Sequence, residues 1–208
     1  MHLHTLHFSY SHFSKPAFVR FPASLTDLDV GYFVEAIIPM VRALSGLRRL
    51  ALRHTLLSRD EFNDLFAAGQ LVDSLDRLEL EITWKKNPIN MIEEGDSDDP
   101  KEEDTTKVDI SHLQNLTFLS STLAPIVLDL VPMLHTLGKL NKVAFHMTNK
   151  MDLTTPTVES MRYLLETKKE LHVEFFIYRL DTQTHTLYAY LSIYFFFLIP
   201  FSRSLFFS

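Results

Sequence analysis

A short pattern of apolar positions recurs along the chain. In residues 47–55, leucines stand at positions 1, 4 and 6, and a hydroxyl residue, Thr55, stands at position 9. Full or weaker copies of this pattern begin at Leu3, Leu47, Leu75, Leu113, Leu140 and Lys168. Positions 4 and 6 lie on the same face of an extended strand, because side chains alternate between the two faces. Each copy therefore predicts a strand with one buried face.

The copies return at a nearly constant interval. Their starting residues are 44, 28, 38, 27 and 28 positions apart, so three of the five intervals lie within one residue of 28. A period of this size is typical of repeat folds, in which each unit buries its apolar face against its neighbours. Helix-start signals follow the strands, and Ser58-x-x-Glu61 has the spacing of a capping box. Alternating strands and helices predict an α/β fold of about six units with parallel strands.

Prolines mark the irregular parts of this pattern. In the long first interval, residues 14–46, Pro16 and Pro22 predict an irregular lead-in. Apolar residues within residues 33–44 then predict a helix, which Pro39 should kink or end. Pro132 is expected inside a later helix, where it should bend the helix axis.

The repeated pattern resembles the leucine-rich repeat over residues 3–178. Leucine-rich repeats usually carry Asn or Cys at position 9, whereas this chain carries Ser or Thr, whose hydroxyl can make part of the same backbone hydrogen bonds. The repeats are therefore similar to the divergent ones of fungal and plant F-box proteins. The resemblance implies a solenoid over residues 1–180 and a non-enzymatic protein–protein interaction role, in which a bound protein is presented to a ubiquitin ligase.

The resemblance also implies a binding surface. In a leucine-rich repeat, strand positions 3, 5 and 7 project from the concave face, and in the fourth copy these are Asn115, Thr117 and Leu119. Across the copies, the charged and histidine residues at these positions are our candidate partner-binding residues: Arg49, Arg53, Arg77, Glu79, Glu81, Lys142, His146, His172 and Glu174. Two interpretations are open: a solvated face with cross-strand ion pairs, or a polar strip that binds a partner protein.

The acidity of the chain comes from one segment. Residues 93–104 contain eight of the 26 acidic residues and one of the 20 lysines and arginines, which leaves 18 acids and 19 bases elsewhere. A run of like charges repels itself, so residues 85–110 are predicted to form a disordered acidic insertion at the edge of the solenoid. The balanced remainder provides no basic field of the kind that binds nucleic acid.

The sequence contains no recognisable catalytic or metal-binding motif. It has no cysteine, which excludes disulfides and thiolate sites. Its five glycines are scattered, and neither a G-x-S-x-G nor an H-E-x-x-H motif occurs. We therefore predict that the protein is not an enzyme and uses no cofactor or metal ion.

The last 28 residues, 181–208, depart from the repeat pattern. They are aromatic and apolar, and no Asp, Glu, Lys or Arg occurs from residue 182 to residue 202. Three interpretations are open: an end cap, a gene-model artefact, or a membrane anchor that begins at Leu187 and ends at Phe207. The apolar core of this tail, residues 187–201, is shorter than the roughly 20 residues of a membrane-spanning helix.

The first residues lack the basic region and apolar run of a signal peptide. A cytoplasmic or nuclear location is therefore expected, with membrane association as the alternative. The first predicted strand begins almost at the first residue, with no segment ahead of it to cap its apolar edge. We expect a longer gene product in which an F-box precedes these repeats.

Overall fold

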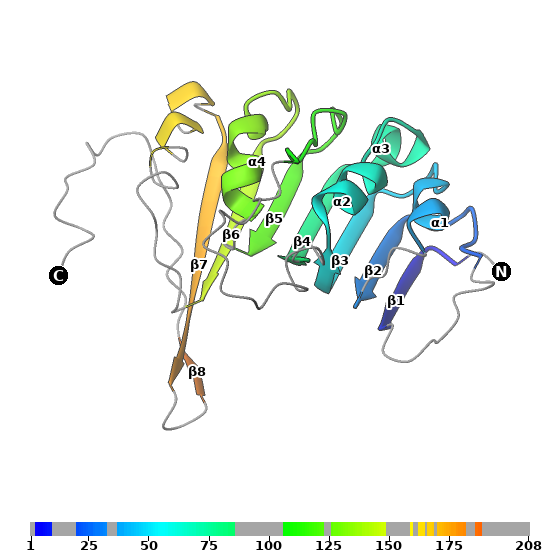
Figure 1. The fold of residues 1–208 in the computed structure, drawn as a ribbon, viewed down its shortest axis with the longest axis horizontal. Coiled ribbons are helices and arrows are strands. Elements are labelled where there is room, and N and C mark those ends of the chain that lie inside the picture. The colour runs from blue at the N-terminus through cyan, green and yellow to red at the C-terminus, as the bar shows by residue number, and fades with distance from the viewer. Residues whose placement is uncertain are drawn as a thin grey trace, which may run out of the picture.

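The computed structural model describes residues 3–9, 20–32, 37–85, 106–122, 126–148, 159, 162–164, 166–168, 170–181 and 186–188. Seven strands lie side by side in chain order, and each is parallel to the next (Figure 1). They are β1 (Thr5–Ser9), β2 (Asp27–Gly31), β3 (Arg49–Leu57), β4 (Arg77–Trp84), β5 (Phe118–Thr122), β6 (Lys142–Thr148) and β7 (His172–Asp181). The predicted α/β fold with parallel strands is confirmed. A short strand, β8 (Thr186–Tyr188), pairs antiparallel with the end of β7.

Helices follow several of these strands. α1 (Ile38–Arg42) connects β2 to β3, and both α2 (Arg59–Leu65) and α3 (Gln70–Ser74) connect β3 to β4. α4 (Ile126–Leu134) connects β5 to β6, and the four helices follow one another along the sheet in Figure 1. Their apolar residues join one core with the inward-facing strand residues, so these helices cover one face of the sheet.

Matching strand positions build this core. One register row consists of Leu28, Leu50, Leu78, Leu119, Val143 and Val173, and each of these side chains is at most 5% exposed. The alternate strand positions point to the opposite side, which we call the open face. Its residues are Thr5, His7, Asp27, Asp29, Arg49, Ala51, Arg53, Arg77, Glu79, Glu81, Phe118, Ser120, Thr122, Lys142, Ala144, His146, His172, Glu174, Phe176 and, at a bulge, His54.

The expected number of about six strands was too low, because the strand β2 was not foreseen. It lies inside residues 14–46, where we predicted an irregular lead-in and a helix. Leu25, Leu28 and Val30 have the spacing of the repeated pattern and are buried. With a copy beginning at residue 25, the 44-residue interval from residue 3 to residue 47 becomes two intervals of 22 residues.

The predicted register was wrong in two later strands. In β5, Leu119 pairs with Leu78 and is fully buried, so this unit begins at Leu116 rather than at Leu113. Leu119 therefore does not lie on the binding face, and Phe118, expected in the core, lies on the open face instead. In β7, Val173 pairs with Val143, so this unit begins two residues later than the predicted start at Lys168. Because the shift is an even number of residues, each residue of β7 stays on the face that the sequence predicts for it.

Local signals set the helix boundaries. The predicted capping box at the start of α2 is confirmed: Glu61 N donates to Ser58 Oγ at 3.1 Å, and Ser58 N donates to Glu61 Oε2 at 2.7 Å. A cap of this kind stabilises a helix by about 1 kcal/mol. Pro39 lies in the first turn of α1, where its missing N–H costs no hydrogen bond, so it does not kink this helix. Residues 33–36, where the first part of the predicted helix falls, lie outside the described residues. Pro132 lies inside α4, as predicted.

The acidic segment, residues 93–104, and the tail after residue 188 lie outside the described residues. Val108 and Ile110, at the end of the segment predicted as an insertion, are buried in the core. Among the helices that the structure describes, none is both long and apolar enough to span a membrane.

Candidate partner-binding face

Arg49 is the centre of an ion-pair network on the open face. From β3, its Nη1 donates to Asp27 Oδ1 on β2 at 2.7 Å, and its Nε donates to Glu79 Oε1 on β4 at 2.9 Å. The Arg49 side chain is only 20% exposed, and that of Glu79 18%. Arg49 therefore joins three adjacent strands through charge-assisted hydrogen bonds, which are stronger than bonds between neutral groups.

Two further arginines complete this network. Arg53 Nε donates to Asp29 Oδ2 at 3.0 Å, and Arg53 Nη2 lies 3.4 Å from Glu79 Oε2. Arg77 Nε donates to Glu79 Oε1 at 2.9 Å. We call Asp27, Asp29, Arg49, Arg53, Arg77 and Glu79 the arginine network; its three positive and three negative charges balance. The side chains of Arg53 and Arg77 are each 46% exposed, so both can still contact a partner.

The network keeps Glu79 ionised. Burial raises the pKa of this carboxyl, but the hydrogen bonds and positive charges of Arg49 and Arg77 together outweigh burial, and the pKa is below its ordinary value. A carboxyl with a lowered pKa contributes stability above its unfolded-state pKa, and this contribution is lost as pH falls through the folded-state value. At neutral pH Glu79 therefore carries the negative charge that pairs with the three arginines.

A second charged cluster lies on β6 and β7. Lys142 Nζ and Glu174 Oε1 are 2.9 Å apart, and His172 Nε2 lies 3.2 Å from the same oxygen. Glu174 is buried, at 8% exposure. Burial raises the pKa of Glu174, but the hydrogen bonds and positive charges of Lys142 and His172 together outweigh burial, so the pKa is lowered.

Aromatic rings lie between and beside these clusters. The Arg77 guanidinium lies 4.1 Å from the centre of the Phe118 ring, and Lys142 Nζ lies 5.9 Å from it. The rings of His146 and Phe176 are stacked, with centres 4.8 Å apart and planes 12° apart. Ser120 Oγ lies 2.9 Å from His146 Nε2. The β5–β7 half of the open face is thus more apolar than the β2–β4 half.

The structure places all nine sequence-predicted residues on the open face. Four belong to the arginine network (Arg49, Arg53, Arg77, Glu79) and three to the second cluster (Lys142, His172, Glu174). Glu81 and His146 belong to neither. Sequence reasoning missed Asp27 and Asp29, because β2 was missed, and it missed Phe118 and Ser120, because the register of β5 was wrong.

A bulge in β3 shapes the end of the network. Leu52 is level with Leu80, but Thr55 is level with Ile82, so one extra residue of β3 fits between these pairs. His54 is this extra residue. Its backbone has a positive φ of 49°, and its side chain projects to the open face. The expected role of position 9 is seen at Thr55, which is buried and whose Oγ1 donates to the Arg53 carbonyl at 3.1 Å. It is also seen at Ser121, which is buried and whose Oγ donates to the Thr122 carbonyl at 3.2 Å, whereas Thr83 is exposed.

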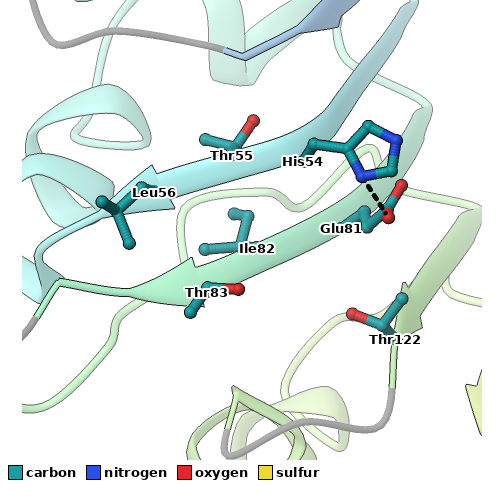
Figure 2. A pocket seen from close by; sticks show the side chains of 7 residues that line it. All are labelled: His54, Thr55, Leu56, Glu81, Ile82, Thr83 and Thr122. Carbon is teal, nitrogen blue, oxygen red and sulfur yellow. Dashed lines mark ion pairs between the residues drawn. The ribbon is translucent and has the colours of Figure 1, made fainter. Parts of the chain in front are cut away.

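An open hollow of about 450 Å³ lies beside this bulge (Figure 2). It is lined by His54, Thr55, Leu56, Glu81, Ile82, Thr83 and Thr122. Within the described ranges, no group of three or more histidines and carboxylates is arranged to hold a metal ion.

Comparisons with protein-family models, with curated proteins and with solved structures found no match for this chain. The class that the geometry defines is an α/β protein with seven parallel strands in chain order, alternating with helices, and with charged and aromatic residues on the open face.

Burial of His146 should make stability depend on pH. Burial lowers the pKa of this imidazole, and the carboxylates of Glu79 and Glu81 raise it only in part. The unfolded chain therefore binds this proton more readily, so the stability contribution present above about pH 6.5 is lost as pH falls toward the folded-state pKa. We expect His146→Gln to show a smaller loss of unfolding free energy than wild type between pH 7.5 and pH 5.

This prediction is measured by urea unfolding of both proteins at the two pH values. His135→Gln, at an exposed position, is the matched control and should retain the wild-type difference. An equal pH dependence in wild type and His146→Gln would contradict the prediction.

Proposed function

We propose that this chain is a non-enzymatic protein–protein interaction module with a divergent leucine-rich-repeat fold, and that the open face binds its protein partner. One observation carries the proposal: the seven strands are parallel and in chain order, and the four described helices all pack on the same face of the sheet. Parallel sheets are usually covered on both faces. A parallel sheet with one open face is the arrangement that repeat solenoids use for binding.

The composition of the open face supports this role. Arginine and aromatic residues are enriched at protein interfaces, and both occur here beside each other, as with Arg77 and Phe118. The arginine network holds its side chains in place before a partner arrives, which reduces the entropy lost on binding.

We further propose a role similar to that of the substrate-recruiting repeats of F-box proteins, which present a bound protein to a ubiquitin ligase, in the cytoplasm or nucleus. The repeat spacing in the sequence supports this proposal. Sequencing the transcript across both ends of the reading frame tests it. An F-box encoded in frame ahead of residue 1 would support the recruiting role, and a transcript that begins as written would contradict it.

The binding role predicts that a single charge reversal on the open face abolishes partner capture. Arg53→Glu places a third acid beside Asp29 and Glu79, so affinity should fall at least about ten-fold. Arg162→Glu is the matched control, because Arg162 is also an exposed arginine paired with an acid, Glu166, but in the helical segment ahead of β7. The measurement is quantitative cross-linking and mass spectrometry of cell extracts with each tagged protein.

Proteins captured by wild type and Arg162→Glu but lost with Arg53→Glu would be partners of the open face. Equal capture by all three proteins would contradict binding through this face. Circular dichroism spectra and melting curves should confirm that both variants are folded.

A second candidate function is that of a repeat protein anchored in a membrane through the tail from Leu187 to Phe207. The observation that favours it is the uncharged, aromatic sequence of residues 182–202. Because β8 pairs with β7, such an anchor would begin after Tyr188. Flotation of the full chain with lipid vesicles tests the idea, and a chain that stays at the bottom of the gradient would contradict it.

A further inference from the structure

Glu81 differs from the other carboxylates of the open face. Within the described strands, the other four each pair with an arginine or lysine: Asp27, Asp29, Glu79 and Glu174. The partner of Glu81 is an imidazole, since His54 Nδ1 lies 2.7 Å from Glu81 Oε1 (Figure 2). A neutral imidazole donates a hydrogen bond but no charge. Glu81 is 38% exposed, so its negative charge is accessible to a partner.

The charge balance around Glu81 favours a cationic ligand. Strands β2, β3 and β4 carry four acids on the open face, namely the three in the arginine network and Glu81. They carry three arginines, all of them engaged within the network. Four acids and three arginines leave one negative charge that no arginine of these strands compensates, and this charge is on Glu81.

Two aromatic rings extend this site on the β2 side. Tyr32, just after β2, and His54 have centres 5.6 Å apart and planes 36° apart. Tyr32 is 52% exposed, and the His54 side chain is 60% exposed. They are the non-glycine residues with positive φ in the described part of the chain, at 57° and 49°. Such backbone strain persists where surrounding contacts enforce it, and here Tyr32 N donates to the Arg53 carbonyl at 2.8 Å.

We propose that Tyr32, His54 and Glu81 form a binding site for an arginine side chain of the protein partner. This inference rests on the proposed function, and it specifies what the open face recognises. A guanidinium is planar, so it can stack on the Tyr32 and His54 rings and direct its N–H groups at the Glu81 carboxylate. Lysine offers a point charge without a plane and fits the same three groups less well.

The hollow beside Glu81 accommodates the rest of the arginine. Its volume of about 450 Å³ is bounded by Leu56, which is 51% exposed, and by Thr83 and Thr122. The methylene groups of an arginine stem can pack on the Leu56 side chain. The threonine hydroxyls can bond to the backbone of the peptide that carries it.

Titration with a small probe tests this site independently of any partner. The probe is N-acetyl-arginine methylamide. Its binding is measured by NMR from the shifts of the Tyr32 and His54 ring signals in the labelled full chain. N-acetyl-citrulline methylamide is the matched probe, because it has nearly the same shape and no charge. We expect saturable shifts with the arginine probe, and affinity about ten-fold lower with the citrulline probe.

Two variants locate the binding. Glu81→Gln removes the charge, and Tyr32→Leu removes the outer ring; each should weaken binding of the arginine probe, with Glu81→Gln about ten-fold weaker than wild type. Asp73→Asn, an exposed acid in α3, is the control and should bind as wild type does. Equal binding of both probes, or undiminished binding by Glu81→Gln, would overturn the proposal.

The partner-capture experiment separates this site from the proposed function. If Arg53→Glu loses a partner that Glu81→Gln retains, the open face is a binding surface but the arginine site is overturned. If the arginine probe binds at Glu81 while capture is unaffected by Arg53→Glu, the arginine site stands and binding of a partner across the whole face is contradicted.

Discussion

Leu50→Asp should unfold the protein. Leu50 is fully buried in the middle of β3, level with Leu28 on one side and Leu78 on the other. An aspartate there either buries an unpaired charge or opens the core to water, and the cost is about 5 kcal/mol or more. Since small domains are stable by roughly 5–15 kcal/mol, the folded population should be largely lost. Circular dichroism and urea unfolding at pH 7.5 would measure the effect.

Leu56→Asp on the same strand is the matched control. Leu56 is 51% exposed because the bulge at His54 turns it out of the core. This variant should unfold within about 0.5 kcal/mol of wild type, as surface substitutions do. A Leu50→Asp protein that melts like wild type, or a Leu56→Asp protein that is unfolded, would contradict the observed faces of β3.

Regular alternation explains which parts of the fold the sequence predicts well. In β3 and β4 the apolar positions Leu50, Leu52, Leu78 and Leu80 recur at strand spacing, and all four are buried. The interval of 28 residues between these two copies leaves room for a strand and a helical segment, and in the structure this segment consists of the two short helices α2 and α3. Where each copy has a single possible register, the pattern alone therefore predicts the core and the parallel pairing.

The strand β2 was missed for a different reason. It has five residues, and its open-face positions are Asp27 and Asp29, which are unfavourable in strands. Its stability comes from its neighbours, because Arg49 and Arg53 on β3 compensate the two carboxylates. Such cross-strand compensation connects residues more than 20 positions apart, and a local pattern contains no signal for it.

The candidate site, like the fold, can be predicted only in part from the sequence. Alternation predicts that Arg49 and Glu79 share a face, and they do, but alternation does not say which arginine pairs with which acid. It also predicts that His54 points into the core, since Arg53 points out. The bulge reverses this, and with it the hydrogen bond from His54 to Glu81 becomes possible. The site proposed for arginine therefore depends on one inserted residue that the apolar spacing does not reveal.

Leu119→Ala should destabilise the protein far more than Phe118→Ala. The sequence allows two registers in β5, because Leu113, Leu116 and Leu119 repeat at a spacing of three. One register buries Phe118 at position 6, and the other buries Ser121 there. Hydrophobicity alone favours the first register, because that register buries a phenylalanine. The structure has the second register, in which Ser121 is buried and its Oγ donates to the Thr122 carbonyl at 3.2 Å.

The expected magnitudes follow from what each side chain contacts. Leu119 is fully buried in the core, so its truncation leaves a cavity and should cost about 3 kcal/mol. Phe118 is half-buried on the open face between two cations, so its truncation should cost about 1 kcal/mol. Urea unfolding of both variants measures the difference. A larger loss with Phe118→Ala would restore the register that begins at Leu113, and it would remove Phe118 from the open face.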